Sequence, residues 1–128
     1  MTFEQFANHI KENIQARFHM ERPNVIQTEM LDLTPQGIAN KEVFRFCRPI
    51  SSNVSNQFWK TLLVTGIDPD QIRDVLQWAA LCKELLLDPE TSDVYLFIIW
   101  SGENNPSIEE CLRIEANEDF CRKFVLKN

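Results

Sequence analysis

Apolar residues at the start of the chain recur at the spacing of an amphipathic helix. Between residues 3 and 18 they stand three or four positions apart, which places them on one side of an α-helix. Thr2 followed by Gln5 has the pattern of a capping box at a helix start. Pro23 cannot continue a helix, because it lacks a backbone donor and restricts the residue before it. The pattern predicts a helix from residue 3 to about Met20.

The following segment predicts two strands. From Asn24 to Leu33 apolar and polar residues alternate weakly, and the turn-forming sequence 34–37 follows. Residues 43–47 are strand formers, with Phe44 and Phe46 on one face and Arg45 on the other. We therefore expect the two strands to form a hairpin.

Two helices are predicted in the middle of the chain. Residues 51–66 suggest a short helix, because Val54, Phe58 and Leu62 cluster on one side before a glycine. A longer helix begins with Asp68 as its cap and Pro69 at its first position, and extends to about residue 87. Its leucines at positions 81, 85, 86 and 87 span more than one face, so at least one must meet a second layer or solvent.

The last third has the clearest pattern. Residues 94–100 form an unbroken run of β-branched and aromatic residues, typical of a strand covered on both faces. Ser107 and Glu110 form a second capping box for a helix to about residue 116, and residues 120–126 resemble a final strand. A right-handed crossover would make the outer two strands parallel neighbours. The predicted fold is α+β or mixed α/β, with a small central sheet of about four strands, three to four helices and a C-terminal strand–helix–strand unit.

Composition supports a compact protein. The chain has 128 residues, of which 44% are hydrophobic and 25% charged, so we expect a single domain over residues 1–128. We expect no secretory signal, because no basic leader precedes an apolar stretch. The longest apolar run falls far short of the roughly 20 residues of a membrane helix, so no membrane partner is expected. These features predict a cytoplasmic protein whose four cysteines are reduced and buried.

The charge argues against nucleic acid as a partner. Nineteen acidic and thirteen basic residues give a net charge of −6, which repels phosphate backbones. The same charge suits either a protein partner or solubility alone, and both interpretations stay open.

Catalytic patterns are weak in this sequence. The three glycines are too scattered for a phosphate-binding loop, and His9 and His19 are too far apart along a helix to share a metal. One thiol, Cys121, precedes Arg122 and Lys123, whose charges would lower a thiol pKa. We therefore predict that the chain is not an enzyme and binds no metal or cofactor.

The aromatic residues allow two interpretations. The chain has tryptophans at positions 59, 78 and 100, together with Phe120 and Phe124 near the C-terminus. Tryptophan is favoured at interface hot spots, yet all three could also belong to the core.

The final third resembles the middle components of ABC-three-component systems. The resemblance lies in residues 93–100, 107–111 and 114–126, and the closing run Asp-Phe-Cys-Arg-Lys at 119–123 contributes most. In that family a small protein lies between an ABC or SMC-like ATPase and an effector component of bacterial anti-phage or genomic-conflict systems. The resemblance implies a non-enzymatic adaptor or scaffold whose partners are the ATPase subunit and the effector subunit.

The resemblance and the aromatic pattern together nominate six residues for the partner interface. They are Asp93, Trp100, Asp119, Cys121, Arg122 and Lys123. A purely structural role for the closing motif stays open, because Asp119 could cap a turn or pair with a neighbouring cation. An alternative function is that of a small acidic immunity protein or antitoxin, since negative charge would steer it toward a basic toxin.

Overall fold

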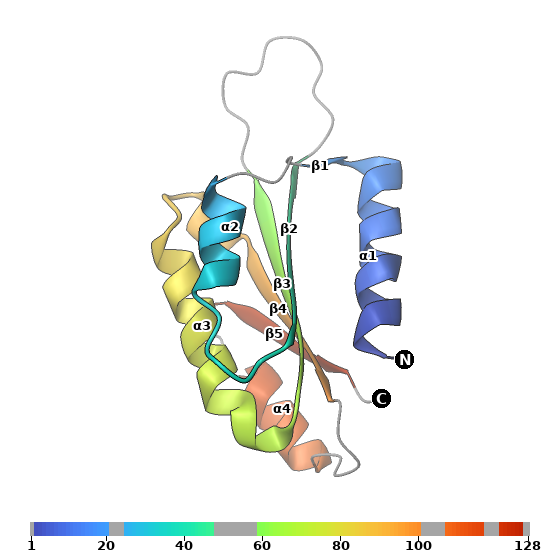
Figure 1. Ribbon diagram of the computed structural model, residues 1–128, viewed down its shortest axis with the longest axis vertical. Coiled ribbons are helices and arrows are strands. Elements are labelled where there is room, and N and C mark those ends of the chain that lie inside the picture. The colour runs from blue at the N-terminus through green and yellow to red at the C-terminus, as the bar shows by residue number, and fades with distance from the viewer. Residues whose placement is uncertain (1, 21–24, 48–58, 101–106, 117–120, 127–128) are drawn as a thin grey trace.

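The chain folds around a five-stranded sheet with helices on both of its faces (Figure 1). The computed structural model describes residues 2–20, 25–47, 59–100, 107–116 and 121–126. The strands, in their order across the sheet, are β1 (His19–Met20), β2 (Asn40–Cys47), β3 (Lys60–Ile67), β4 (Val94–Trp100) and β5 (Arg122–Leu126). β1, β2 and β3 are antiparallel neighbours, whereas β3, β4 and β5 are parallel. The predicted mixed α+β class is confirmed, with the very short β1 added at one edge.

The helices divide unequally between the two faces. They are α1 (Phe3–Arg17), α2 (Val25–Asp32), α3 (Ile72–Glu84) and α4 (Ile108–Ala116), with short 3₁₀ turns η1 (Pro69–Gln71) and η2 (Glu90–Ser92). Figure 1 shows α2, α3 and α4 on one face and α1 on the other. Two successive crossovers, β3–α3–β4 and β4–α4–β5, advance in the same direction across the sheet. Because such crossovers share one handedness, α3 and α4 lie on the same face.

The first helix begins as the sequence predicts and ends slightly earlier. The backbone N–H of Gln5 donates to Thr2 Oγ1 at 3.2 Å, and the Thr2 N–H donates to Gln5 Oε1 at 3.0 Å. This is the predicted capping box. The helix ends at Arg17 because residues 19–20 pair with the end of β2 instead of continuing the helix.

The prediction of a strand and hairpin over residues 24–47 is wrong in its first half. Residues 25–32 form helix α2, and β2 pairs with β3 instead of with this segment. The apolar residues Ile26, Met30 and Leu33 are four and three positions apart, a helical spacing that packs them against the core. Gln27 on the same helix donates its side-chain N–H to the carbonyl of Val43 at 2.7 Å. The strand at 43–47 is confirmed as part of β2.

The predicted helix over residues 51–66 is also wrong where it can be compared. Residues 60–67 form β3, and residues 51–58 lie outside the described part of the chain. β3 lies between β2 and β4, so its backbone groups find partners on both sides. Leu63 and Ile67 pack toward α3, whereas Val64 packs toward α1. Both faces of β3 are covered, so even Thr61 and Thr65 are fully buried.

The predicted elements of the C-terminal half are all present, although α3 ends at Glu84 instead of near Leu87. Helix α3 follows Asp68 and Pro69, β4 is buried on both faces, and β5 lies parallel to β4. The predicted division of the leucines is also present, since Leu86 is buried and Leu87 is 84% exposed. The four cysteines are all buried, and none of them forms a disulfide within the described residues. Among the helices of the described residues, none has the length and apolarity needed to cross a membrane.

Candidate functional site

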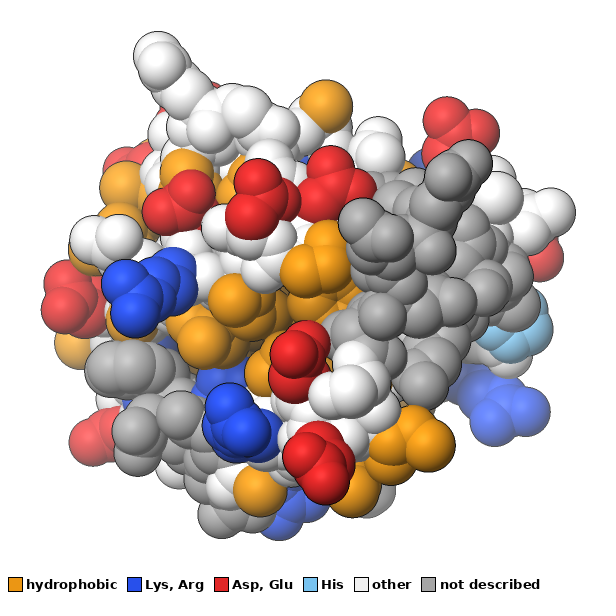
Figure 2. Space-filling model, turned by 90° about the horizontal axis from the view of Figure 1, so that it is seen from below, with side chains coloured by type: hydrophobic (Ala, Val, Ile, Leu, Met, Phe, Trp, Pro, Cys, Tyr) orange, Lys and Arg blue, Asp and Glu red, His pale blue; other side chains and the backbone are white. Residues whose placement is uncertain are grey.

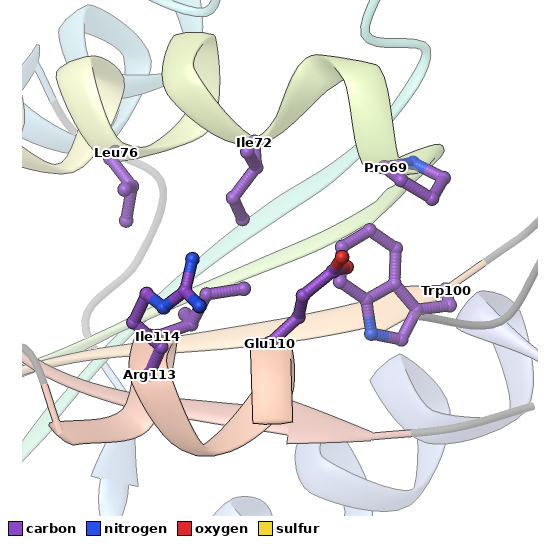
Figure 3. Close-up of a pocket in the computed structure, with 7 residues that line it drawn as sticks. All are labelled: Pro69, Ile72, Leu76, Trp100, Glu110, Arg113 and Ile114. Atoms are coloured by element: carbon purple, nitrogen blue, oxygen red, sulfur yellow. The ribbon is translucent and has the colours of Figure 1, made fainter. Parts of the chain in front are cut away.

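A groove lies between α3 and α4, near the C-terminal ends of β3 and β4 (Figure 3). Its volume is about 310 Å³. It is lined by Pro69 of η1, Ile72 and Leu76 of α3, Trp100 of β4, and Glu110, Arg113 and Ile114 of α4. In Figure 3 the α3 side chains point toward the side chains that rise from α4. The groove is therefore an apolar hollow with one acid and one base on its α4 side.

The fold explains why the groove forms at this place. Each of the two helices follows a strand of the parallel set, so both begin at the same edge of the sheet and return over the same face. Ile72 and Leu76 stand one helical turn apart on the flank of α3 that faces α4. Trp100 is only 1% exposed and closes the end of the hollow. The carboxyl edge of parallel strands is also where open sheets commonly bind ligands.

Charged side chains surround this end of the molecule. Glu110 and Arg113 line the groove directly, and both are exposed to solvent. The first turns of η1, α3 and α4 add Asp70, Asp74 and Glu109. Figure 2 views this end of the molecule and shows apolar side chains at its centre with acidic and basic side chains around them.

A second apolar surface lies on the other side of α4. Ile108 is 67% exposed and Leu112 is 60% exposed, and they stand one helical turn apart. At about 100° per residue, Leu112 lies roughly 160° around the helix from Glu110. We call this pair the outer surface of α4. Neither residue lines the groove, so the two surfaces can be occupied independently.

The nominated interface residues fall at two ends of β4. Asp93 precedes β4, and its carbonyl accepts the backbone N–H of Thr61 at 2.9 Å. Arg122 and Lys123 are aligned with Tyr95 and Leu96 in the β4–β5 register, so the described part of the closing motif also lies at this end. Trp100 lies at the other end, roughly 20 Å along the strand at about 3.3 Å per residue. The structure thus separates Trp100 from Asp93, Arg122 and Lys123.

The closing motif is partly internal. Lys123 is only 3% exposed and donates from Nζ to the carbonyl of Cys121 at 3.0 Å, whereas Arg122 is exposed. Asp119 lies outside the described residues. Of the motif residues whose structure is described, Arg122 alone has an exposed side chain, and the interface role of this motif stays a prediction.

The thiols are poorly suited to nucleophilic chemistry. Burial raises the pKa of Cys121, and the nearby charges of Lys123 and Lys83 lower it only in part. The predicted lowering by basic neighbours is therefore outweighed by desolvation. Burial, together with repulsion between the thiolate forms of Cys82 and Cys121, raises the pKa of Cys82 to about 12. Both thiols are protonated near neutral pH.

The described residues also offer no cluster of three or more His, Cys, Asp or Glu side chains suited to hold a metal ion. His9 lies exposed on α1 and contacts Asn13 of the same helix.

Sequence patterns did not identify the groove. Ile72 and Leu76 belong to the apolar stripe of the predicted helix that begins after Asp68. The width of this stripe is the sequence feature that could have indicated the groove. Arg113 and Ile114 carry no comparable signal, because only the crossover topology brings α4 beside α3.

Comparison with known proteins identifies the family of this chain. A family model described as ABC-three component (ABC-3C) system Middle Component 1 matches residues 57–128, which is more than half of the chain. The match includes β3, β4, β5, α3 and α4, and therefore both the groove and the outer surface of α4. No curated protein and no solved structure matches the chain significantly. The chain belongs to the Middle Component 1 family of ABC-three-component systems, in agreement with the resemblance found in its final third.

Proposed function

We propose that this middle component is a non-enzymatic adaptor that joins an ABC or SMC-like ATPase to an effector component of the same bacterial defence or conflict system. Membership in the family makes the chain a subunit of a system with several components. An adaptor must contact two partners at once, so it needs two accessible surfaces that do not overlap. The family-matched segment has two such surfaces, on opposite sides of α4.

The observation that carries the proposal is the exposure of apolar side chains on both sides of this one helix. Ile108 and Leu112 are mostly exposed on the outer surface, and Ile114 faces the groove. Covering a large aliphatic side chain completely stabilises a complex by about 1.5–3 kcal/mol. Two such surfaces therefore favour association with two partners.

Co-expression of the tagged chain with its genomic neighbours tests the proposal. The mass of the purified complex should show both a large ATPase and a second subunit. A lone monomer would overturn the proposal, and a single small toxic partner would support the neutralising function instead.

Matched variants then test whether the two surfaces serve different partners. Leu76→Ser alters the groove and Leu112→Ser alters the outer surface, and each removes the same apolar side chain from a helix. We expect each variant to release one partner and keep the other, with thermal unfolding showing that both remain folded. Loss of the same partner from both variants, or of neither, contradicts the two-surface arrangement.

The non-enzymatic part of the proposal has its own test. Asp93→Asn and Cys121→Ala remove the two groups that an enzyme hypothesis would use. We expect the system to keep its biological activity in both variants as long as the complex assembles. Loss of activity from an intact, folded complex would indicate catalysis by this chain.

A further inference from the structure

We infer that the α3–α4 groove binds a basic amphipathic helix of a partner subunit, with apolar side chains in the groove and Lys or Arg side chains along its rim. The inference rests on the proposed function, because it takes the occupant to be part of a protein partner. It adds the chemistry of that partner and the surface that recognises it.

The lining of the groove determines which side chains can enter. Five of its seven lining residues are apolar: Pro69, Ile72, Leu76, Trp100 and Ile114. A volume of about 310 Å³ lies at the small end of the range of roughly 300–1,000 Å³ seen for small-molecule pockets. Apolar side chains of the two flanking helices face each other across the hollow, which suits the side chains on one face of a third helix.

The charged residues around the groove determine which charges the bound helix should carry beside its apolar side chains. Residues 68–73 and 109–113 contain four acidic and two basic side chains, all exposed, a formal balance of −2. The acidic members are Asp68, Asp70, Glu109 and Glu110, and the basic members are Arg73 and Arg113. The N-termini of α3 and α4 lie at the same end and offset about half a charge each. The remaining negative potential favours a cationic segment and repels an acidic one.

The two contributions act differently on binding. Exposed charge pairs contribute about 0–1 kcal/mol each, so the rim sets orientation, association rate and choice of partner. Burial of apolar side chains in the groove supplies most of the affinity. Binding should therefore weaken with salt, and it should be lost when the apolar contacts are removed.

Synthetic helices provide a direct test with the full chain. We would titrate it by calorimetry with three peptides of about 15 residues, long enough for four helical turns, that share one leucine face. Their remaining positions carry Lys and Arg, Gln, or Glu. We expect the basic peptide to bind at least about tenfold more tightly than the acidic one at low salt. The difference should shrink near 1 M salt, where the Debye length is about 3 Å.

Matched variants locate the binding on the protein. Glu110→Lys changes a residue that lines the groove, and Glu109→Lys makes the same charge change on the adjacent, non-lining residue. We expect Glu110→Lys to weaken the basic peptide about tenfold and Glu109→Lys to weaken it less. Leu76→Ser should likewise weaken binding strongly, whereas Leu112→Ser should leave it unchanged. The indole N–H signal of Trp100 in NMR spectra, assigned with Trp100→Phe, should shift on binding.

Several results would overturn the inference. These are no binding by any peptide, equal affinity for the basic and acidic peptides, or equal losses in the groove variants and their controls. If the peptide test fails while the complex with the partner subunits still co-purifies, the inference about the groove is wrong and the adaptor proposal is unaffected. Binding of the basic peptide without any co-purifying partner removes the adaptor proposal and leaves the groove as a peptide-binding site.

Discussion

The two faces of the sheet are built very differently. One face is covered by α2, α3 and α4, and its core includes Met30, Trp78 and Trp100, each at most 1% exposed. Among the described helices only α1 covers the other face, which holds a smaller aromatic cluster. There Phe97 lies 5.5 Å from Phe6 and 5.1 Å from Phe124, measured between ring centroids, and Phe124 is 38% exposed.

The difference indicates a division of roles. The three-helix face contains the tightly packed core and also supports the groove, so stability and binding geometry depend on the same residues. The α1 face is held by a smaller cluster of buried and partly buried side chains, and α1 precedes the segment that the family model matches. We therefore expect substitutions on the three-helix face to cost more stability than those on the α1 face.

The largest effect should come from Trp78. Its side chain is fully buried and its Nε1 donates to the carbonyl of Met30 at 2.8 Å, which joins α3 to α2. Trp78→Ala should lower the free energy of unfolding by about 3–5 kcal/mol, measured by urea denaturation. Phe6→Ala on the other face should cost clearly less. Equal costs would remove the distinction between the faces.

A buried ion pair provides the next test. Arg45 of β2 is 3% exposed and pairs with Glu90 of η2, which is 22% exposed. Glu90→Ala removes the acid and should lower the free energy of unfolding by about 2–4 kcal/mol, since loss of one partner leaves a charge in the interior. An exposed acid on α3, changed as Glu84→Ala, serves as a control and should have a small effect. Similar effects of both substitutions would show that the pair contributes little.

Alkaline pH should weaken the three-helix face through Cys82. Its pKa is raised from 9.0 to about 12 by burial, so the native state keeps a proton that the unfolded state releases. The stabilisation is complete below pH 9 and is lost as the pH rises from 9 toward 12. This thiol should contribute a slope of at most about 1.4 kcal/mol per pH unit. Cys82→Ala should flatten the loss, and an unchanged slope would exclude this thiol as its cause.

The smallest effect should come from the partly exposed aromatic on β5. Phe124→Ala removes the stacking on Phe97 but creates no closed cavity, because more than a third of the ring already faces solvent. We expect a loss of about 1 kcal/mol, measured as a decrease in Tm. A loss as large as that of Trp78→Ala would show that the α1 face is as important to folding as the other.

The helices and strands that the sequence predicts correctly are those with strong local sequence signals. The segments after Asp68, at 94–100 and after Ser107 have caps or long apolar runs, and each forms the predicted element. Residues 25–32 and 60–67 lack such signals. Their apolar spacing suits either a helix or a strand, and pairing with distant strands decides the outcome for β3.

The candidate site was less predictable than the fold, because it depends on contacts between distant segments. Ile72 and Ile114 are far apart in sequence and meet across the groove only through two crossovers. Lys123 shows the opposite problem. Its charge suggests a surface residue, whereas the structure places it inside, beside the carbonyl of Cys121. Sequence patterns report burial tendencies, and they do not report which helix lies beside which.

The central claim is that this chain bridges two other subunits, and reconstitution tests it most directly. The purified ATPase and effector subunits would be mixed with and without this chain, and the mass of each assembly measured in solution. We predict that the two subunits associate only when the chain is present, and that Leu76→Ser or Leu112→Ser abolishes the full assembly. Association of the two subunits to the same extent without this chain would contradict the adaptor function.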